Sequence, residues 1–182
     1  MSGKGPFYIA REQFGPNKGG EWNRYIKWSG LTQLHELVSQ DGMLCPTVLP
    51  EIKDEYWPHI VREDYMLFYF TDLEYLLKQV SGIAEKNLLC LFLNPTVQPI
   101  APPAAVQFSF LGYDLIEVTG DISALSNCGG FPKAFDNSEL NEVGLLSDLI
   151  RAREVQARLR EFYPKEHHAN CDVWAIFRAE GI

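Results

Sequence analysis

A cysteine followed by two glycines is the local feature most suggestive of chemistry, in the sequence Asn-Cys-Gly-Gly at residues 127–130. Consecutive glycines allow positive φ angles and close approach of the backbone. A thiolate at Cys128 beside free backbone N–H groups would combine a nucleophile with an oxyanion site. His167 or His168 could act as the base, and Asp172 could orient it. The interpretation that the sequence favours is a tight loop before a helix with Cys128 packed inside, and a thiol-dependent enzyme is the alternative.

The stretch 166–172 also contains side chains that zinc prefers. His167, His168 and Cys171, with Cys128 as a fourth ligand, could form a tetrahedral site. However, adjacent histidines rarely bind one structural metal together, and the sequence has no second closely spaced pair of ligands. We therefore predict no metal and no cofactor, and interpret this stretch as a polar loop between a helix and a strand.

An acidic and aromatic stretch at residues 51–65 suits protein recognition. Tryptophan and tyrosine are frequent anchors of interfaces, and carboxylates steer a basic partner toward them. The alternative is a long surface loop whose aromatic side chains fold back on the core. The residues predicted to bind a partner are Asp54, Glu55, Tyr56, Trp57, Glu63 and Asp64.

The charge distribution favours either plain solubility or a basic protein as the partner. The net charge of −8 comes from 16 basic and 24 acidic side chains among 182 residues. Residues 31–150 carry 17 of the acidic and 5 of the basic side chains, which gives this middle section a net charge of −12. Nucleic-acid binding needs clustered Lys and Arg, so we predict no nucleic-acid partner.

Apolar runs are short throughout the chain. The longest, at residues 88–93 and 100–106, fall far short of the roughly 20 residues that a membrane-spanning helix needs. The first residues lack the apolar segment of a signal peptide. These features predict a cytoplasmic protein without a membrane partner, while the oligomeric state is left open.

Hydrophobic patterning and turn residues predict the elements that must position these side chains. Residues 1–20 form a loop-rich N-terminal segment that contains a short strand at 7–10. A capping box at residues 71–74 predicts a helix that ends near residue 80, and a hairpin is expected across residues 112–114. The other predicted strands are 22–28, 65–70, 87–93, 106–111, 115–119 and 172–179, and the other helices are 31–40 and one or two between 138 and 163. The predicted fold is α+β, a single domain over residues 1–182, with a mixed or antiparallel sheet packed by two or three helices.

Two segments resemble small uncharacterised bacterial cytosolic proteins. They are residues 111–148, with Ser-Asn-Cys-Gly-Gly-Phe-Pro-Lys-Ala-Phe at 126–135, and Glu-His-His-Ala-Asn-Cys-Asp-Val-Trp-Ala-Ile-Phe-Arg at 166–178. Some families of this build resemble immunity proteins, which neutralise a toxin. This resemblance carries over no catalytic residue. The acidic middle section, the acidic and aromatic stretch at residues 51–65 and the absence of a standard catalytic motif predict a non-enzymatic acidic binding protein, inhibitor or immunity-like, that masks a basic partner protein. The alternative function is the thiol-dependent enzyme built on Cys128.

Overall fold

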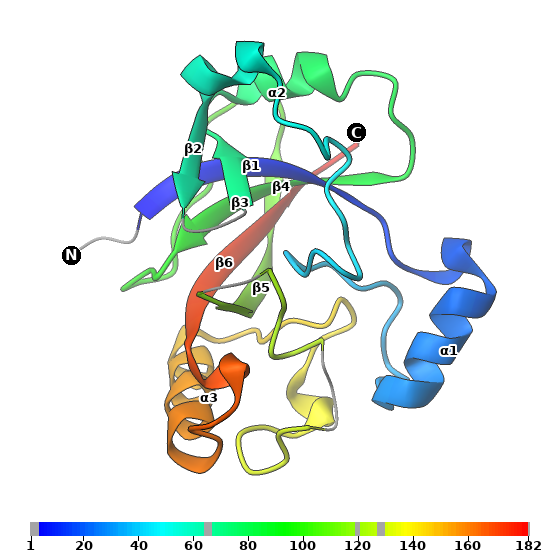
Figure 1. Cartoon of the computed structure of the whole chain (residues 1–182), viewed down its shortest axis with the longest axis vertical. Coiled ribbons are helices and arrows are strands. Elements are labelled where there is room, and N and C mark those ends of the chain that lie inside the picture. Colours follow the sequence, from blue (N-terminus) through cyan, green and yellow to red (C-terminus); the bar gives the residue numbers. More distant parts are fainter. Residues whose placement is uncertain (1–3, 64–66, 119–120, 127–129, 182) are drawn as a thin grey trace.

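A six-stranded antiparallel sheet forms the centre of the protein (Figure 1). The structure is a computed structural model that describes residues 4–63, 67–118, 121–126 and 130–181. The strands are β1 (Lys4–Glu12), β2 (Ile60–Glu63), β3 (Leu67–Phe70), β4 (Lys86–Leu93), β5 (Phe108–Glu117) and β6 (Cys171–Ala179). They lie in the order β2-β3-β1-β4-β6-β5, and each neighbouring pair is antiparallel.

Helices surround the sheet. The described α-helices are α1 (Gly20–Ser29), α2 (Leu73–Gln79) and α3 (Leu149–Phe162), and the 3-10 helices are η1 (Pro16–Lys18), η2 (Asp54–His59), η3 (Asn137–Glu139) and η4 (His167–Ala169). α2 packs against β1, and α3 packs against β5 and β6 at the opposite end of the molecule (Figure 1). The predicted α+β class is confirmed, with the antiparallel form of the sheet. None of the described helices is long and apolar enough to cross a membrane.

Both faces of the central strands are buried, which explains why their sequences are apolar without interruption. Side chains of a strand alternate between the two faces of a sheet. On β1, Tyr8 and Ala10 join the apolar cluster that also contains buried side chains of α2 and α3. Phe7 and Ile9 join a second cluster on the other face. That second face is covered in part by Val38, Val143 and Leu145, which belong to segments outside the helices and strands.

The predicted strand at residues 22–28 is wrong, because this segment forms the helix α1. Trp22, Tyr25 and Ser29 are its buried residues, and they recur at the spacing of one helical face. Trp28 lies off that face and is 61% exposed. β-propensity of the aromatic residues therefore misled the prediction, and the burial of one helix face decided the structure.

The predicted helix at residues 31–40 is also wrong. Leu31, Leu34, Leu37 and Val38 are all buried, as their spacing suggested, but the segment has no regular helix. Its backbone hydrogen bonds go to distant segments instead, with Leu37 N donating to the Phe14 carbonyl at 2.8 Å and Val38 N to the Val143 carbonyl at 3.0 Å. These tertiary bonds replace the local bonds of a helix.

The predicted hairpin across residues 112–114 is replaced by the single continuous strand β5. Its pairing with β6 shifts register between Phe110 and Gly112, which marks a bulge. Gly112 has a φ of 149°. A Cβ there would lie 2.7 Å from the Leu146 carbonyl oxygen, so the glycine permits this close approach. The glycine that suggested a hairpin turn in the sequence therefore marks a β-bulge in the structure.

The remaining helices agree better with the sequence. α2 is confirmed, although its N-cap is Asp72, whose carboxylate accepts a hydrogen bond from Tyr75 N at 3.0 Å. α3 begins after Asp148, which caps it through Arg151 N at 2.8 Å. Near Ser138, where the predicted helical region begins, the structure has only the short 3-10 helix η3.

Candidate functional site

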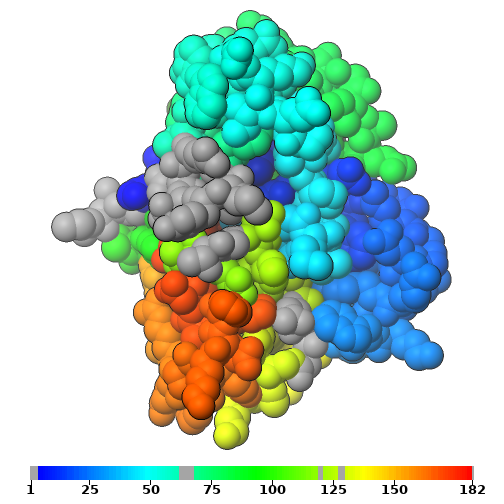
Figure 2. Space-filling view, in the orientation of Figure 1, coloured from blue at the N-terminus to red at the C-terminus, as the bar shows by residue number. Residues whose placement is uncertain are grey.

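The 3-10 helix η2 presents the acidic and aromatic residues predicted to bind a partner. It lies at the same end of the molecule as α2 (Figure 1), in the cyan region at the top of Figure 2. Tyr56 anchors it, because this side chain is fully buried and its ring packs edge-on against Phe70 at 5.4 Å and Tyr75 at 6.0 Å. The burial of this tyrosine fixes which side of η2 faces outward.

A second contact ties the C-terminal end of η2 to α2. The His59 ring is stacked on the Tyr75 ring, with 3.8 Å between centroids and 8° between planes. His59 Nδ1 lies 2.9 Å from Asp72 Oδ2. Tyr75 also donates its hydroxyl to the Glu55 carbonyl at 3.3 Å. η2 is therefore held by side chains at both of its ends.

Asp72 takes part in both the helix cap and this contact. The pKa of its carboxyl group is lowered, first by the hydrogen bond from Tyr75 N and then by the hydrogen bond with His59. The charged carboxylate is the form that both bonds favour. A negative charge therefore persists here below the usual titration range of an aspartate.

The exposed residues of η2 include one large aromatic side chain and two carboxylates. Trp57 is 53% exposed, and Asp54 and Glu55 are exposed. We call these three residues the η2 surface. Tyr56 was predicted to bind a partner as well, but this prediction is wrong because the side chain is fully buried.

The predicted surface extends beyond what the structure describes. The side chain of Glu63 and the whole of Asp64 lie outside the described residues. Another carboxylate in contact with η2 is Asp72, the N-cap of α2, which is paired with His59. Glu74 is exposed in the first turn of the same helix. The contact of Asp72 with η2 was not predicted, because it depends on the packing of η2 against α2.

The thiol chemistry predicted from the sequence depends on Cys128, which lies outside the described residues. The other cysteines, Cys45, Cys90 and Cys171, are buried and free. Burial raises the pKa of each of these three thiols to about 12. Since the thiolate is the reactive form, these three positions are unsuited to nucleophilic chemistry.

The two predicted histidines differ in their surroundings. His167 is exposed, whereas the His168 side chain is 12% exposed and its Nδ1 lies 3.4 Å from Glu117 Oε1. Asp172 was predicted to orient the base, but its Oδ1 accepts a hydrogen bond from Asn94 at 2.8 Å. The carboxylate beside His168 is therefore Glu117, which was not among the predicted site residues.

His168 lines a hollow of about 340 Å³ that is mainly apolar. The exposed side chains of Trp28 and Met43 form part of its rim, and Ser126 contributes a polar group. Pockets of this kind, apolar with a few polar groups, are typical of binding sites. The hollow thus brings His168 near the residue that lies two positions before Cys128 in the sequence.

The described residues contain no group of three His, Cys, Asp or Glu side chains placed to hold a metal ion. Of the ligands considered, His167 is exposed and Cys171 is buried. His168 is instead paired with Glu117.

A buried polar network joins the loops that cover the second face of the sheet. Asp114 is fully buried, and its carboxylate accepts hydrogen bonds from the hydroxyls of Ser39 at 2.6 Å and Ser123 at 2.5 Å. Asp41 accepts from Ser126 at 2.6 Å. The pKa of Asp114 is raised because burial disfavours its charged form, although the two serine hydrogen bonds partly oppose this. All of these residues have structural partners, so the network stabilises the loops.

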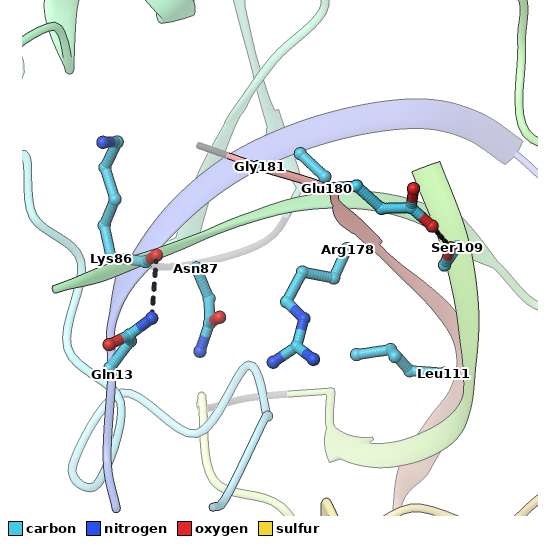
Figure 3. A pocket seen from close by; sticks show the side chains of 9 residues that line it. Gln13, Lys86, Asn87, Ser109, Leu111, Arg178, Glu180 and Gly181 are labelled. Carbon is cyan, nitrogen blue, oxygen red and sulfur yellow. Dashed lines mark hydrogen bonds between the residues drawn. The ribbon is translucent and has the colours of Figure 1, made fainter. Parts of the chain in front are cut away.

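A cavity with a mixed polar and apolar lining, which was not predicted, lies at the end of the sheet next to Asn87 and Arg178 (Figure 3). The sequence indicates this cavity only weakly, because a single asparagine at the start of an apolar strand is common.

Comparison with family models, with curated proteins and with solved structures finds no match to this chain. The fold and site therefore define an α+β protein with an acidic, aromatic surface.

Proposed function

We propose that the protein is a non-enzymatic binding protein that masks a basic partner protein, in the manner of an inhibitor or immunity protein. The observation that carries this proposal is the η2 surface, where Trp57 is 53% exposed on the same short helix as the exposed residues Asp54 and Glu55. A large aromatic side chain held out from a fixed helix is typical of the few residues that provide most of the binding energy.

The rigidity of η2 supports binding. Ordering a flexible loop at an interface costs free energy, so a surface that is already fixed binds more tightly. Tyr56 is buried, and His59 is stacked on Tyr75. Trp57 is thus presented by a backbone that needs little further ordering.

The charges around Trp57 support a basic partner. Carboxylates on a binding surface accelerate association with a cationic protein and discriminate against acidic ones. Asp54, Glu55, Asp72 and Glu74 lie on η2 and at the start of α2, although Lys53 and Lys78 offset part of their charge. Three carboxylates of the acidic middle section, Asp41, Asp114 and Glu117, are buried and add nothing to this surface.

The test compares two matched variants with the wild-type protein. The first, D54N/E55Q/W57A, removes two carboxylates and the exposed indole of the η2 surface. The control, E154Q/E161Q/F162A, makes the same kind of change on α3, where Phe162 is 43% exposed. Each immobilised protein is incubated with lysate of the source cells, retained proteins are quantified by mass spectrometry, and dissociation constants are measured for the purified captured protein.

We expect a basic protein that the wild type and the control retain equally. The η2 variant should bind it at least about 30-fold more weakly, which corresponds to about 2 kcal/mol. Equal weakening by the control would show that general acidity causes the retention. Unchanged affinity of the η2 variant would show that another surface binds the partner.

A second proposal is the thiol-dependent enzyme, with Cys128 as nucleophile and His168 as base. The observation in its favour is the pair of His168 and Glu117, 3.4 Å apart beside a mainly apolar hollow. A carboxylate that orients a histidine is a common arrangement for a general base. The test is the rate of alkylation of Cys128 at neutral pH in the wild type and in H168A, with H167A as control. A rate that is equal in all three proteins would contradict this proposal.

A further inference from the structure

A cavity of about 500 Å³ with a mixed polar and apolar lining lies where β4 and β5 begin and β6 ends (Figure 3). Its volume is within the range of about 300–1,000 Å³ that small-molecule sites usually occupy. It is distinct from the η2 surface and from the hollow beside His168. The side chains that matter for its chemistry are Gln13, Asn87, Leu111 and Arg178.

Asn87 faces this cavity with its side-chain amide (Figure 3). The residue is only 3% exposed. Within the described part of the chain its side-chain amide forms no hydrogen bond and opens toward the cavity. The donor and the acceptor of Asn87 are therefore available to a group that enters the cavity.

Arg178 provides a cation next to this amide. It is directly opposite Leu89 in the pairing of β4 with β6, and Asn87 is two residues from Leu89 on the same face. One guanidinium nitrogen, Nη1, forms an ion pair with Glu36. The guanidinium group points into the cavity between Asn87 and Leu111 (Figure 3). Arginine has five N–H donors, so the pair with Glu36 leaves others for a ligand.

Arg11 adds a second positive charge behind Asn87. The two residues are directly opposite each other in the pairing of β1 with β4, so their side chains share a face of the sheet. Arg11 is 2% exposed and donates from Nη2 to the Gln40 carbonyl at 2.8 Å. Its Nε has no partner among the described residues, and no described carboxylate forms an ion pair with it. The charge of Arg11 is therefore not cancelled by a contact.

The carboxylates near the cavity are already engaged. Glu36 is paired with Arg178, and the Glu180 carboxylate accepts the hydroxyl hydrogen bond of Ser109. The Lys86 ammonium group is turned toward the Ile83 carbonyl, 2.7 Å away. The N–H donors of Arg178 and Asn87 face the cavity, while the Glu180 carboxylate keeps its charge and is turned toward Ser109 (Figure 3). N–H donors beside the charge of an arginine are the chemistry that binds oxyanions.

We propose that this cavity binds a small ligand that carries an oxyanion, a carboxylate or a phosphate. Arg178 and Asn87 donate hydrogen bonds to the oxyanion, while Arg11 stabilises its charge from behind. Leu111 contacts the apolar part of the ligand. This site is independent of the protein partner proposed above, because it lies on a different part of the molecule.

The test uses succinate and inorganic phosphate as probes, with sodium chloride at matched ionic strength as the reference. Backbone amide chemical shifts are followed by NMR during each titration. We expect shifts at Asn87, Arg178 and Glu180 that saturate with one of the two probes, and the probe that saturates identifies the oxyanion. Shifts that match those of sodium chloride for both probes would overturn the proposal.

Two substitutions probe the site itself. Asn87→Asp keeps the shape of the side chain but places a carboxylate opposite the ligand, so binding of the probe should weaken at least about tenfold. Arg178→Gln should weaken it similarly, whereas Arg158→Gln, on the exposed side of α3, should leave it unchanged. The spectrum without probe shows whether each variant is folded. Unchanged binding by Asn87→Asp, or equal weakening by Arg158→Gln, would contradict the proposal.

Discussion

The His59 ring lies flat on the Tyr75 ring, 3.8 Å between centroids, and this stack joins η2 to α2. The same imidazole pairs through Nδ1 with Asp72, the residue that caps α2. One side chain therefore connects the helix that carries Trp57 to the cap of the helix beneath it. The proposed binding surface depends on this junction as well as on its own exposed residues.

Replacing His59 should loosen η2 without altering the residues it exposes. In H59A we expect amide exchange at residues 54–59 to accelerate about tenfold, because the stacking and the bond to Asp72 are worth about 1–2 kcal/mol together. Hydrogen exchange measured by mass spectrometry checks this. H35A, which removes an exposed histidine, is the control and should leave the exchange of this segment unchanged. Equal exchange in H59A and the wild type would show that Tyr56 alone holds η2.

The buried carboxyl group of Asp114 should make stability fall as pH rises. Its pKa is raised in the folded protein, because burial disfavours the charge. The folded state therefore keeps this proton to a higher pH than the unfolded state, whose pKa is about 3.9. The stabilisation that the protonated group provides is complete below that value and is lost as the pH rises toward the folded pKa.

The variant D114N tests this effect, because the amide does not titrate. Unfolding by urea is measured at several pH values between about 3 and 8, and the wild type should lose stability relative to D114N as the pH increases. D136N is a control of opposite sign, since hydrogen bonds from Ser138 lower the pKa of Asp136. The wild type should therefore gain stability relative to D136N as the pH rises from the lowered pKa of Asp136 through the unfolded value of about 3.9. A pH-independent difference for D114N would contradict the prediction.

The contribution of the hydrogen bonds around Asp114 to the free energy of unfolding can be measured separately. D114A removes the acceptor for Ser39 and Ser123, and it leaves both hydroxyl groups without their partner in a buried site. We expect a loss of about 3 kcal/mol in the free energy of unfolding, from the unsatisfied polar groups and the space left behind. Urea denaturation gives this value directly. A loss below about 1 kcal/mol would mean that the two serines find other partners.

Cys128 should dominate the thiol chemistry of the folded protein. Cys45, Cys90 and Cys171 are buried, and burial raises the pKa of each to about 12. At neutral pH an alkylating reagent should therefore leave these three unmodified and label at most one site per chain, as measured by intact mass. C128S should abolish the fast labelling, and addition of denaturant should expose all remaining thiols. Rapid labelling of more than one site in the folded protein would contradict the burial.

Gly112 should be essential to the bulge of β5. Alanine at this position would adopt a φ of 149° and would bring its Cβ within 2.7 Å of the Leu146 carbonyl oxygen. We expect G112A to lower the free energy of unfolding by about 3 kcal/mol, through strain and steric overlap. G82A is the matched control, because Gly82 also has a positive φ, 82°, but has nothing within 4 Å of the added Cβ. It should cost about 1 kcal/mol. Equal costs for both would show that backbone strain alone matters.

The sequence alone determined the elements whose local signals agree with their burial. The strands β4 and β6 are apolar on both faces, and α2 has a capping residue followed by apolar residues at helical spacing. In these segments pattern, propensity and caps all indicate one structure. The acidic and aromatic character of η2 was also visible, as was the division of charge along the chain.

The tertiary structure decided what local patterns leave open. Aromatic residues at 22–28 have strand propensity, but this segment is a helix, in which Trp22 and Tyr25 both pack against Phe14. Leu37 and Val38 are buried without a helix, because backbone groups of distant segments satisfy their N–H groups.

The same physical reason applies to the sites. Each site depends on residues that are distant in the sequence. Tyr56 is buried, His168 is paired with Glu117, and Asn87 and Arg178 meet at one cavity because of the register of their strands. Sequence spacing records which side chains can share a face of one element. It does not record which elements pack together, since that choice is made by the burial and hydrogen bonding of the whole chain.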